Sequence, residues 1–141
     1  MRRYVFASHH QLAEGLKDTT QFLNNYSEAS QKIYTINAYV DKGEDDITDR
    51  VKALFDSFDA QDEVIVLTDM MGGSVNQKFL PYLSEKVHVI TGMNLALAMS
   101  FLLMPEDIPF TSEMVNSIVE DCKSQIIYMN AMQSSVSDDD E

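Results

Sequence analysis

Two histidines stand where an apolar run of the sequence stops. His9 and His10 follow "YVFAS", and Asp69 follows a second apolar run, "EVIVLT". If both runs are neighbouring strands of a parallel sheet, His9 faces Asp69 across about one strand spacing, roughly 4.8 Å. A carboxylate bonded to one imidazole nitrogen fixes the tautomer and leaves the other nitrogen free as a nucleophile. His9 and Asp69 are therefore the candidate catalytic pair.

A short glycine-containing stretch lies close to this pair. Gly72, Gly73 and Ser74 follow Asp69 and precede a helical pattern. Backbone N–H groups at the start of a helix can bind an anion, and glycines allow its close approach. A nucleophilic histidine, an orienting carboxylate and an anion cradle together predict a phosphohistidine site, because phosphoryl transfer depends mainly on positioning and charge stabilisation. A structural explanation stays open, since paired glycines are common in turns and an aspartate after a strand is often a cap.

Three other side chains receive lesser roles. We expect His10 to begin a helix and to act as a modulator at the edge of the site, where its charged form would disfavour protonation of His9. His88, within "KVHVIT", is predicted to pack in a strand, and the single cysteine, Cys122, is predicted to lie in the core. We expect no metal site and no cofactor.

The elements that must position these residues alternate along the chain. Strands are predicted over residues 3–8, 32–39, 63–68, 86–91 and 125–132. Helices are predicted over residues 10–26, 46–58, 94–104 and 111–124, with a further helix that begins after Ser74 and kinks or ends at Pro81. Repeated strand and helix units favour a parallel sheet with right-handed crossovers.

The predicted fold class is therefore α/β: a doubly wound, mainly parallel four-stranded sheet with helices on both faces and a C-terminal fifth strand. That strand follows a helix directly, so we expect it at a sheet edge in a dimer interface, with exchange between subunits as one arrangement.

Composition narrows the class of protein further. The chain has 141 residues and a formal net charge of −13, which argues against nucleic-acid binding because that affinity comes mainly from Lys and Arg. It contains no apolar window long enough for a membrane helix and no signal-peptide pattern, so a cytoplasmic location is expected. We predict one domain over residues 1–132 and a disordered acidic tail over residues 133–141.

Several stretches resemble one protein family. "VFASHHQLAEGL" resembles the first strand and active-site turn of mannose-type enzyme IIA domains of the bacterial sugar phosphotransferase system. "VIVLTDMMGGSVNQ" is similar to the family's second signature, and "VITGMNLALAM" to its fourth strand and Gly-x-Asn turn. The resemblance extends over roughly residues 3–132. One position departs from the pattern: His10 stands where the family typically has glycine.

This resemblance implies a phosphotransferase that acts through a phosphohistidine intermediate. His9 would accept a phosphoryl group from the histidine phosphocarrier protein and pass it to an enzyme IIB during sugar uptake, with Asp69 as its orienting partner. The resemblance also implies a homodimer and an indirect association with a membrane sugar permease.

Other classes of protein remain open at this point. A response-regulator receiver would need an acidic pair where residues 8–10 stand, and a flavin-binding module would need aromatic residues flanking a phosphate loop. A non-catalytic regulatory interaction domain would leave the histidines idle. A related phosphotransfer domain that serves dihydroxyacetone kinases is the alternative within the same family.

Overall fold

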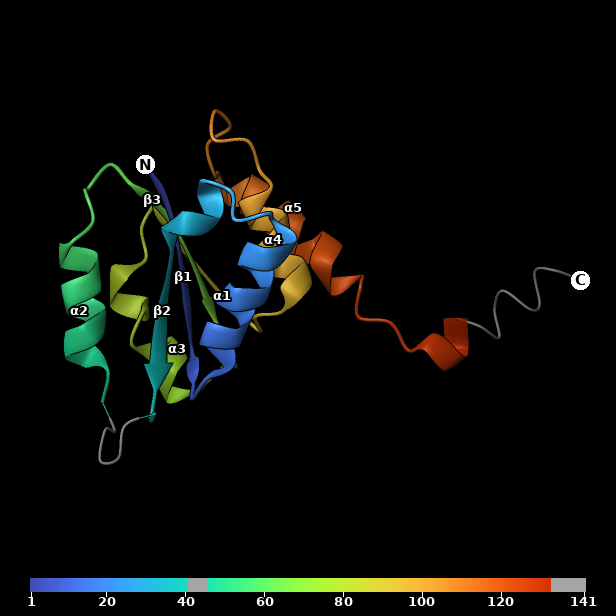
Figure 1. Ribbon diagram of the computed structural model, residues 1–141, viewed down its shortest axis with the longest axis horizontal. Helices are drawn as coiled ribbons and strands as arrows, with labels where there is room; N and C mark the ends of the chain where they lie inside the picture. The colour runs from blue at the N-terminus through green and yellow to red at the C-terminus, as the bar shows by residue number, and fades with distance from the viewer. Residues whose placement is uncertain (41–45, 133–141) are drawn as a thin grey trace, which may run out of the picture.

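Strands and helices alternate along the described part of the chain. The computed structural model describes residues 1–40 and 46–132, so the predicted tail lies outside the described residues (Figure 1). The strands are β1 (Arg2–His9), β2 (Ile33–Ala38), β3 (Glu63–Thr68) and β4 (Val87–Thr91). The helices are α1 (Leu12–Leu23), α2 (Thr48–Asp56), α3 (Ser74–Gln77), α4 (Leu95–Leu102) and α5 (Ser112–Lys123), with short 3₁₀ helices η1 (Ala29–Lys32) and η2 (Leu80–Tyr82).

The four strands form one parallel sheet in the order β2-β1-β3-β4. This is the predicted doubly wound arrangement, and it makes β1 and β3 neighbours. The register pairs Ala7 with Thr68, so the residues that follow these two positions emerge side by side at the carboxyl ends of the strands.

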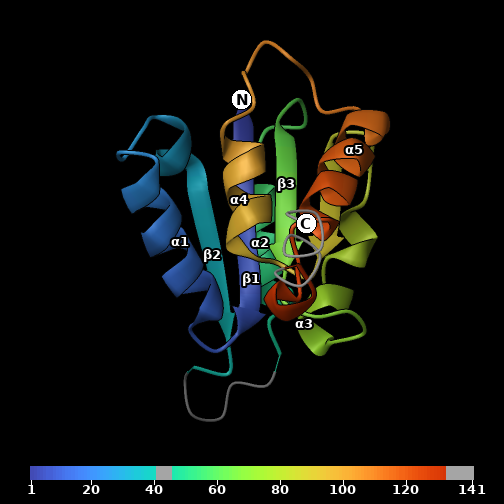
Figure 2. The same ribbon diagram turned by 90° about the vertical axis from the view of Figure 1, so that its right-hand side faces the viewer.

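Helices cover both faces of the sheet. In Figures 1 and 2, α1, α4 and α5 lie on one face and α2 and α3 on the other. Alternate residues of β1 point into the two cores: Tyr4 and Phe6 join the cluster under α4 and α5, whereas Val5 and Ala7 join the cluster on the opposite face. Because helices cover both faces, the residues that point to either face are apolar, and β1 and β3 therefore appear in the sequence as continuous apolar runs.

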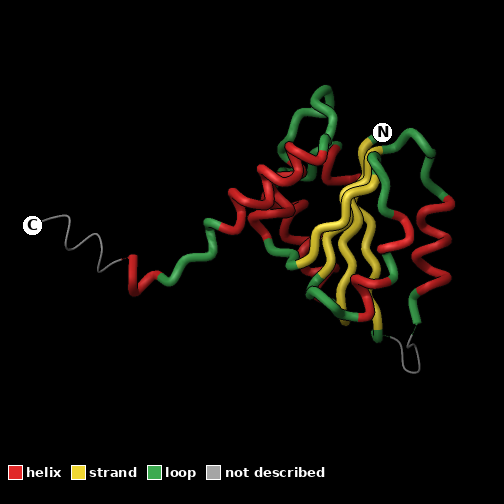
Figure 3. Tube along the Cα trace, turned by 180° about the vertical axis from the view of Figure 1, so that it is seen from behind, coloured by secondary structure: helices red, strands yellow, loops and turns green. Residues whose placement is uncertain are grey.

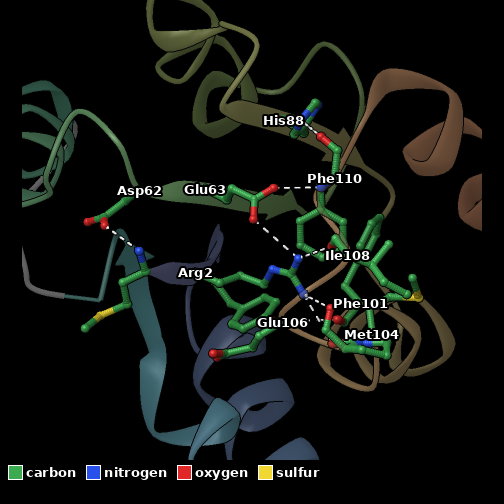
Figure 4. Close-up of polar contacts among 12 residues, drawn as sticks. Arg2, Asp62, Glu63, His88, Phe101, Met104, Glu106, Ile108 and Phe110 are labelled. Atoms are coloured by element: carbon green, nitrogen blue, oxygen red, sulfur yellow. Dashed lines mark hydrogen bonds and ion pairs between the residues drawn. The ribbon is translucent and has the colours of Figure 1, made fainter.

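A buried arginine organises the other end of the sheet. Arg2 is 2% exposed, and its guanidinium donates to the carbonyl oxygens of Met104 at 3.2 Å and Pro105 at 2.9 Å, and to that of Ile108 (Figure 4). It also pairs with Glu63 at 3.3 Å. Strands β1 and β3 are thereby tied to the loop between α4 and α5, at the end of the sheet away from His9 and His10.

The predicted fifth strand does not form in the described chain. Residues 126–128 have no regular structure, residues 129–132 are helical, and the segment extends away from the domain (Figures 1 and 3). Ile126 is 78% exposed and Tyr128 72%. The β-prone composition of this segment does not produce a strand here, because a strand needs a partner to satisfy its backbone hydrogen bonds.

Among residues 1–40 and 46–132, no helix combines the length and the apolar character needed to cross a bilayer.

Candidate active site

His9 and Asp69 meet at the carboxyl ends of β1 and β3. His9 is the last residue of β1, and Asp69 follows β3 directly. His9 Nδ1 lies 2.7 Å from Asp69 Oδ2, and the backbone N–H of His9 donates to the same oxygen at 2.8 Å. Because a carboxylate only accepts hydrogen bonds, Nδ1 carries the proton and Nε2 is left unprotonated in the neutral ring. The predicted juxtaposition of the two side chains is therefore present, at hydrogen-bonding distance.

The Asp69 carboxylate is held in its charged form. Its side chain is 9% exposed, and burial by itself would raise its pKa. The hydrogen bonds from the backbone and ring of His9 outweigh that cost, so the pKa of Asp69 lies below its usual value. A charged Asp69 is the form that can orient a neutral imidazole and stabilise a positive one.

The glycine-containing stretch packs against the His9 ring. Gly72 has a φ of 75°, a left-handed conformation that favours glycine. A Cβ atom at Gly73 would lie 3.1 Å from Met70 Cγ and 3.4 Å from His9 Cε1, so a side chain there would crowd Met70 and touch the His9 ring. The predicted anion cradle has fewer free backbone N–H groups than expected. The Gly73 N–H already donates to the Met70 carbonyl at 3.3 Å, and α3 is only four residues long.

His10 does not begin the helix, contrary to our expectation. It has a φ of 55°, and α1 begins two residues later at Leu12. A right-handed helix cannot include a residue in this conformation. The His10 backbone N–H donates to the Ala38 carbonyl at 2.7 Å, which ties this turn to the end of β2, and its side chain is exposed.

A further ring at the site, that of Tyr39, was not among the residues predicted from the sequence. Tyr39 directly follows β2, and its ring stacks on that of His9 with 5.5 Å between centroids and 23° between planes. Its hydroxyl lies 2.8 Å from Ser74 Oγ. The only available signal was position, since the residue after β2 adjoins the end of β1 in a 2-1-3-4 sheet.

The two remaining candidates lie away from the site. His88 lies in β4, and its Nε2 donates to the Phe110 carbonyl oxygen at 3.1 Å (Figure 4). Cys122 lies in the core under α4 and α5 at 2% exposure, as predicted.

Comparison with known proteins gives the class of this domain. The profile of the EIIA-man family, described as the PTS system fructose IIA component, matches residues 3–119. A solved structure from Klebsiella pneumoniae subsp. pneumoniae, proposed to be a phosphoenolpyruvate-dependent sugar phosphotransferase system permease, is similar at 35% identity and a TM-score of 0.80. That match covers 92% of this chain and 91% of the other.

Two further solved structures are similar. A IIA protein associated with the fucose utilization operon of Streptococcus pneumoniae has 26% identity and a TM-score of 0.70, covering 94% of this chain and 96% of the other. The mannose/sorbose specific IIA subunit of Enterococcus faecalis has 20% identity and a TM-score of 0.70, covering 89% and 92%, a likeness of fold.

The fold and these matches define a component of the sugar phosphotransferase system. The chain belongs to the EIIA-man family of IIA components, and the family supports a phosphoryl carrier role in that system.

Proposed function

We propose that this chain carries a phosphoryl group on Nε2 of His9. The group would come from the histidine phosphocarrier protein and pass to an enzyme IIB during sugar uptake. The observation that carries the proposal is the 2.7 Å contact between His9 Nδ1 and Asp69, which leaves Nε2 unprotonated. The His9 side chain is also 38% exposed, so a partner protein can reach it.

The transfer step follows from this geometry. The Nε2 lone pair of His9 attacks the phosphorus atom of the donor's phosphohistidine. A new N–P bond forms, and the donor's N–P bond breaks with its electron pair returning to the donor imidazole. His9 keeps its Nδ1 proton and becomes positively charged, and the Asp69 carboxylate stabilises that charge. Transfer to the enzyme IIB is a second displacement: a nucleophile of that partner forms a new bond to phosphorus, and the N–P bond of His9 breaks with its electron pair returning to Nε2.

The surroundings of His9 suit contact with partner proteins. Met70 is 55% exposed and Met71 is 83% exposed, and both directly follow Asp69. Exposed methionines supply adaptable apolar contacts, which a carrier that meets two partners in turn requires. Within the proposal, Gly72, Gly73 and Ser74 border the phosphoryl group, with Ser74 supplying a hydroxyl.

Location and assembly belong to the same proposal. We place the chain in the cytoplasm, where it would associate with a membrane sugar permease through the enzyme IIB. We also propose a homodimer, supported by the exposed apolar side chains of residues 126–132.

Intact mass measurement tests the proposed function. The chain is incubated with phosphoenolpyruvate, enzyme I and the histidine phosphocarrier protein, with a reaction lacking phosphoenolpyruvate as the control. We expect one added phosphoryl group that is lost in acid and stable in base, as a phosphohistidine is. No adduct, or an acid-stable one, would contradict the proposal.

A further inference from the structure

Tyr39 adopts a conformation that its residue type disfavours. Its φ is 62°, in the left-handed region where a bulky side chain is uncommon. Such a conformation persists only where the surrounding structure holds it, and residues of this kind cluster at functional sites. At Tyr39, both the ring and the hydroxyl are engaged, and each contacts a member of the candidate site.

The ring lies against His9. The 5.5 Å centroid separation and 23° interplanar angle make this a stacked pair. His9 Nδ1 is already tied to Asp69, and His9 Cε1 faces Gly73, whose added Cβ would lie 3.4 Å away. The Tyr39 ring packs on a face of the imidazole, so the direction of Nε2 is set by three neighbours instead of two.

The stack also suits the charge that develops during transfer. His9 becomes positively charged when Nε2 bonds to phosphorus while Nδ1 keeps its proton. The face of an aromatic ring attracts a nearby cation, and the attraction strengthens as water is excluded. The Tyr39 ring is therefore matched to the phosphorylated state of His9 as well as to the free one.

The hydroxyl of Tyr39 reaches Ser74. The two oxygens lie 2.8 Å apart, and each hydroxyl has one proton to donate. If Tyr39 donates to Ser74 Oγ, the Ser74 proton is left for another acceptor. Oxygens of a phosphoryl group on His9 are such an acceptor, and Ser74 begins α3 immediately after Gly73.

We propose that Tyr39 is a positioning residue, whose ring holds the His9 imidazole and whose hydroxyl orients the Ser74 hydroxyl toward the phosphoryl group. This inference rests on the proposed function and extends it by one residue and one hydrogen bond. The ring and the hydroxyl of Tyr39 make separate contributions, and comparison of two substitutions distinguishes them.

Substitution of Tyr39 tests both contributions. Tyr39→Phe keeps the ring and removes the hydroxyl, and Tyr39→Leu removes both. Tyr26 supplies matched controls, because it also has a left-handed φ, of 52°, is 61% exposed and lies in the turn after α1. The measurement is the single-turnover rate of phosphoryl transfer from the phosphorylated histidine phosphocarrier protein, with thermal unfolding checked for every variant.

We expect Tyr39→Phe to slow transfer by about 3-fold to 10-fold and Tyr39→Leu by about 10-fold to 100-fold, while Tyr26→Phe and Tyr26→Leu leave it unchanged. Because the hydroxyl acts through Ser74, Tyr39→Phe should have no further effect in a Ser74→Ala background. That coupling is a result that a merely structural role would not produce.

Rates in both Tyr39 variants that equal those of the Tyr26 controls would overturn the inference. Losses that add fully in the Tyr39→Phe, Ser74→Ala double variant would overturn the assignment of the hydroxyl. Failure of the unsubstituted chain to accept phosphate would be a distinct outcome, because it would overturn the proposed function itself.

Discussion

Asp69 distinguishes the two ring nitrogens of His9. Its carboxylate accepts from Nδ1 at 2.7 Å, and its lowered pKa keeps it charged at neutral pH. An asparagine could instead donate from its amide group and favour the tautomer with the proton on Nε2. We therefore expect Asp69→Asn to slow phosphoryl transfer by about 10-fold to 1,000-fold while leaving the fold intact, as measured by single-turnover kinetics and circular dichroism.

Asp56→Asn is the control for this change. Asp56 is an exposed residue of α2 that pairs with Lys52 at 2.6 Å. It lies outside the site, so its substitution should leave the rate as it was. An Asp69→Asn protein as fast as this control would show that Asp69 does not orient His9.

His10 bears a backbone cost that glycine would not. Its φ of 55° disfavours any residue with a Cβ atom, which gives a physical reason for the glycine that typifies the family here. Relief of this strain in His10→Gly should raise the free energy of unfolding by about 1 kcal/mol. The greater freedom of glycine in the unfolded chain offsets part of that gain. Chemical denaturation measures this, with His10→Ala as the variant that keeps the cost.

Both His10 variants should still accept phosphate, because the nucleophile in this account is His9. A His10→Gly protein no more stable than His10→Ala would show that the left-handed turn at residue 10 is not a significant source of strain.

At the scale of elements, Arg2 joins two strands to one loop. It is 2% exposed, its guanidinium lies 3.9 Å from the centre of the Phe110 ring, and its partner Glu63 also accepts the Phe110 N–H at 2.7 Å. Removing one member of a buried ion pair leaves its partner charged and unpaired. We expect Arg2→Leu to lower the free energy of unfolding by about 3–5 kcal/mol, as measured by urea denaturation.

A double-mutant cycle with Glu63→Gln is the control. The two losses should be less than additive, because both changes break the same contact. Transfer per folded molecule should be unchanged, since Arg2 lies at the end of the sheet opposite to His9. Full additivity of the two losses would contradict a direct coupling of these residues.

The elements were largely predictable from pattern, and the turns between them were not. Continuous apolar runs such as "EVIVLT" indicate strands buried on both faces, and β3 has the predicted bounds. The two parallel strands that such runs form bring His9 and Asp69 together by topology alone. Pattern does not reveal the left-handed turns at His10 and Tyr39, because neither position holds the glycine that would signal one.

The strand predicted over residues 125–132 is absent from the single chain, and its pairing in a dimer stays a prediction. β-branched and aromatic residues favour a strand only when a neighbouring strand accepts their hydrogen bonds. That partner depends on assembly, which the sequence of one chain does not describe. Tyr39 was not predicted as a site residue, because a tyrosine after a strand is common and does not by itself indicate a site. Its role comes from its stacking on the His9 ring, which the sequence does not show.

At the scale of the whole molecule, the C-terminal segment carries the prediction of a dimer. Ile126, Tyr128 and Met129 are each more than half exposed in the single chain. We expect the full chain to sediment as a dimer at equilibrium. Deletion of residues 125–141 should yield monomers or aggregates, because it removes this apolar surface.

Deletion of residues 134–141 alone is the matched control and should change little. A full-length chain that sediments as a monomer would refute the dimer.

The central claim is that His9 is the phosphoacceptor, and locating the phosphate tests it most directly. The chain, phosphorylated through the histidine phosphocarrier protein, is digested, and the peptide that contains residues 9 and 10 is fragmented by a method that preserves the N–P bond. We predict that tandem mass spectrometry places the phosphate on His9, with His9→Ala unmodified and His10→Ala modified. Phosphate on His10, together with a His9→Ala chain that still accepts it, would contradict the account.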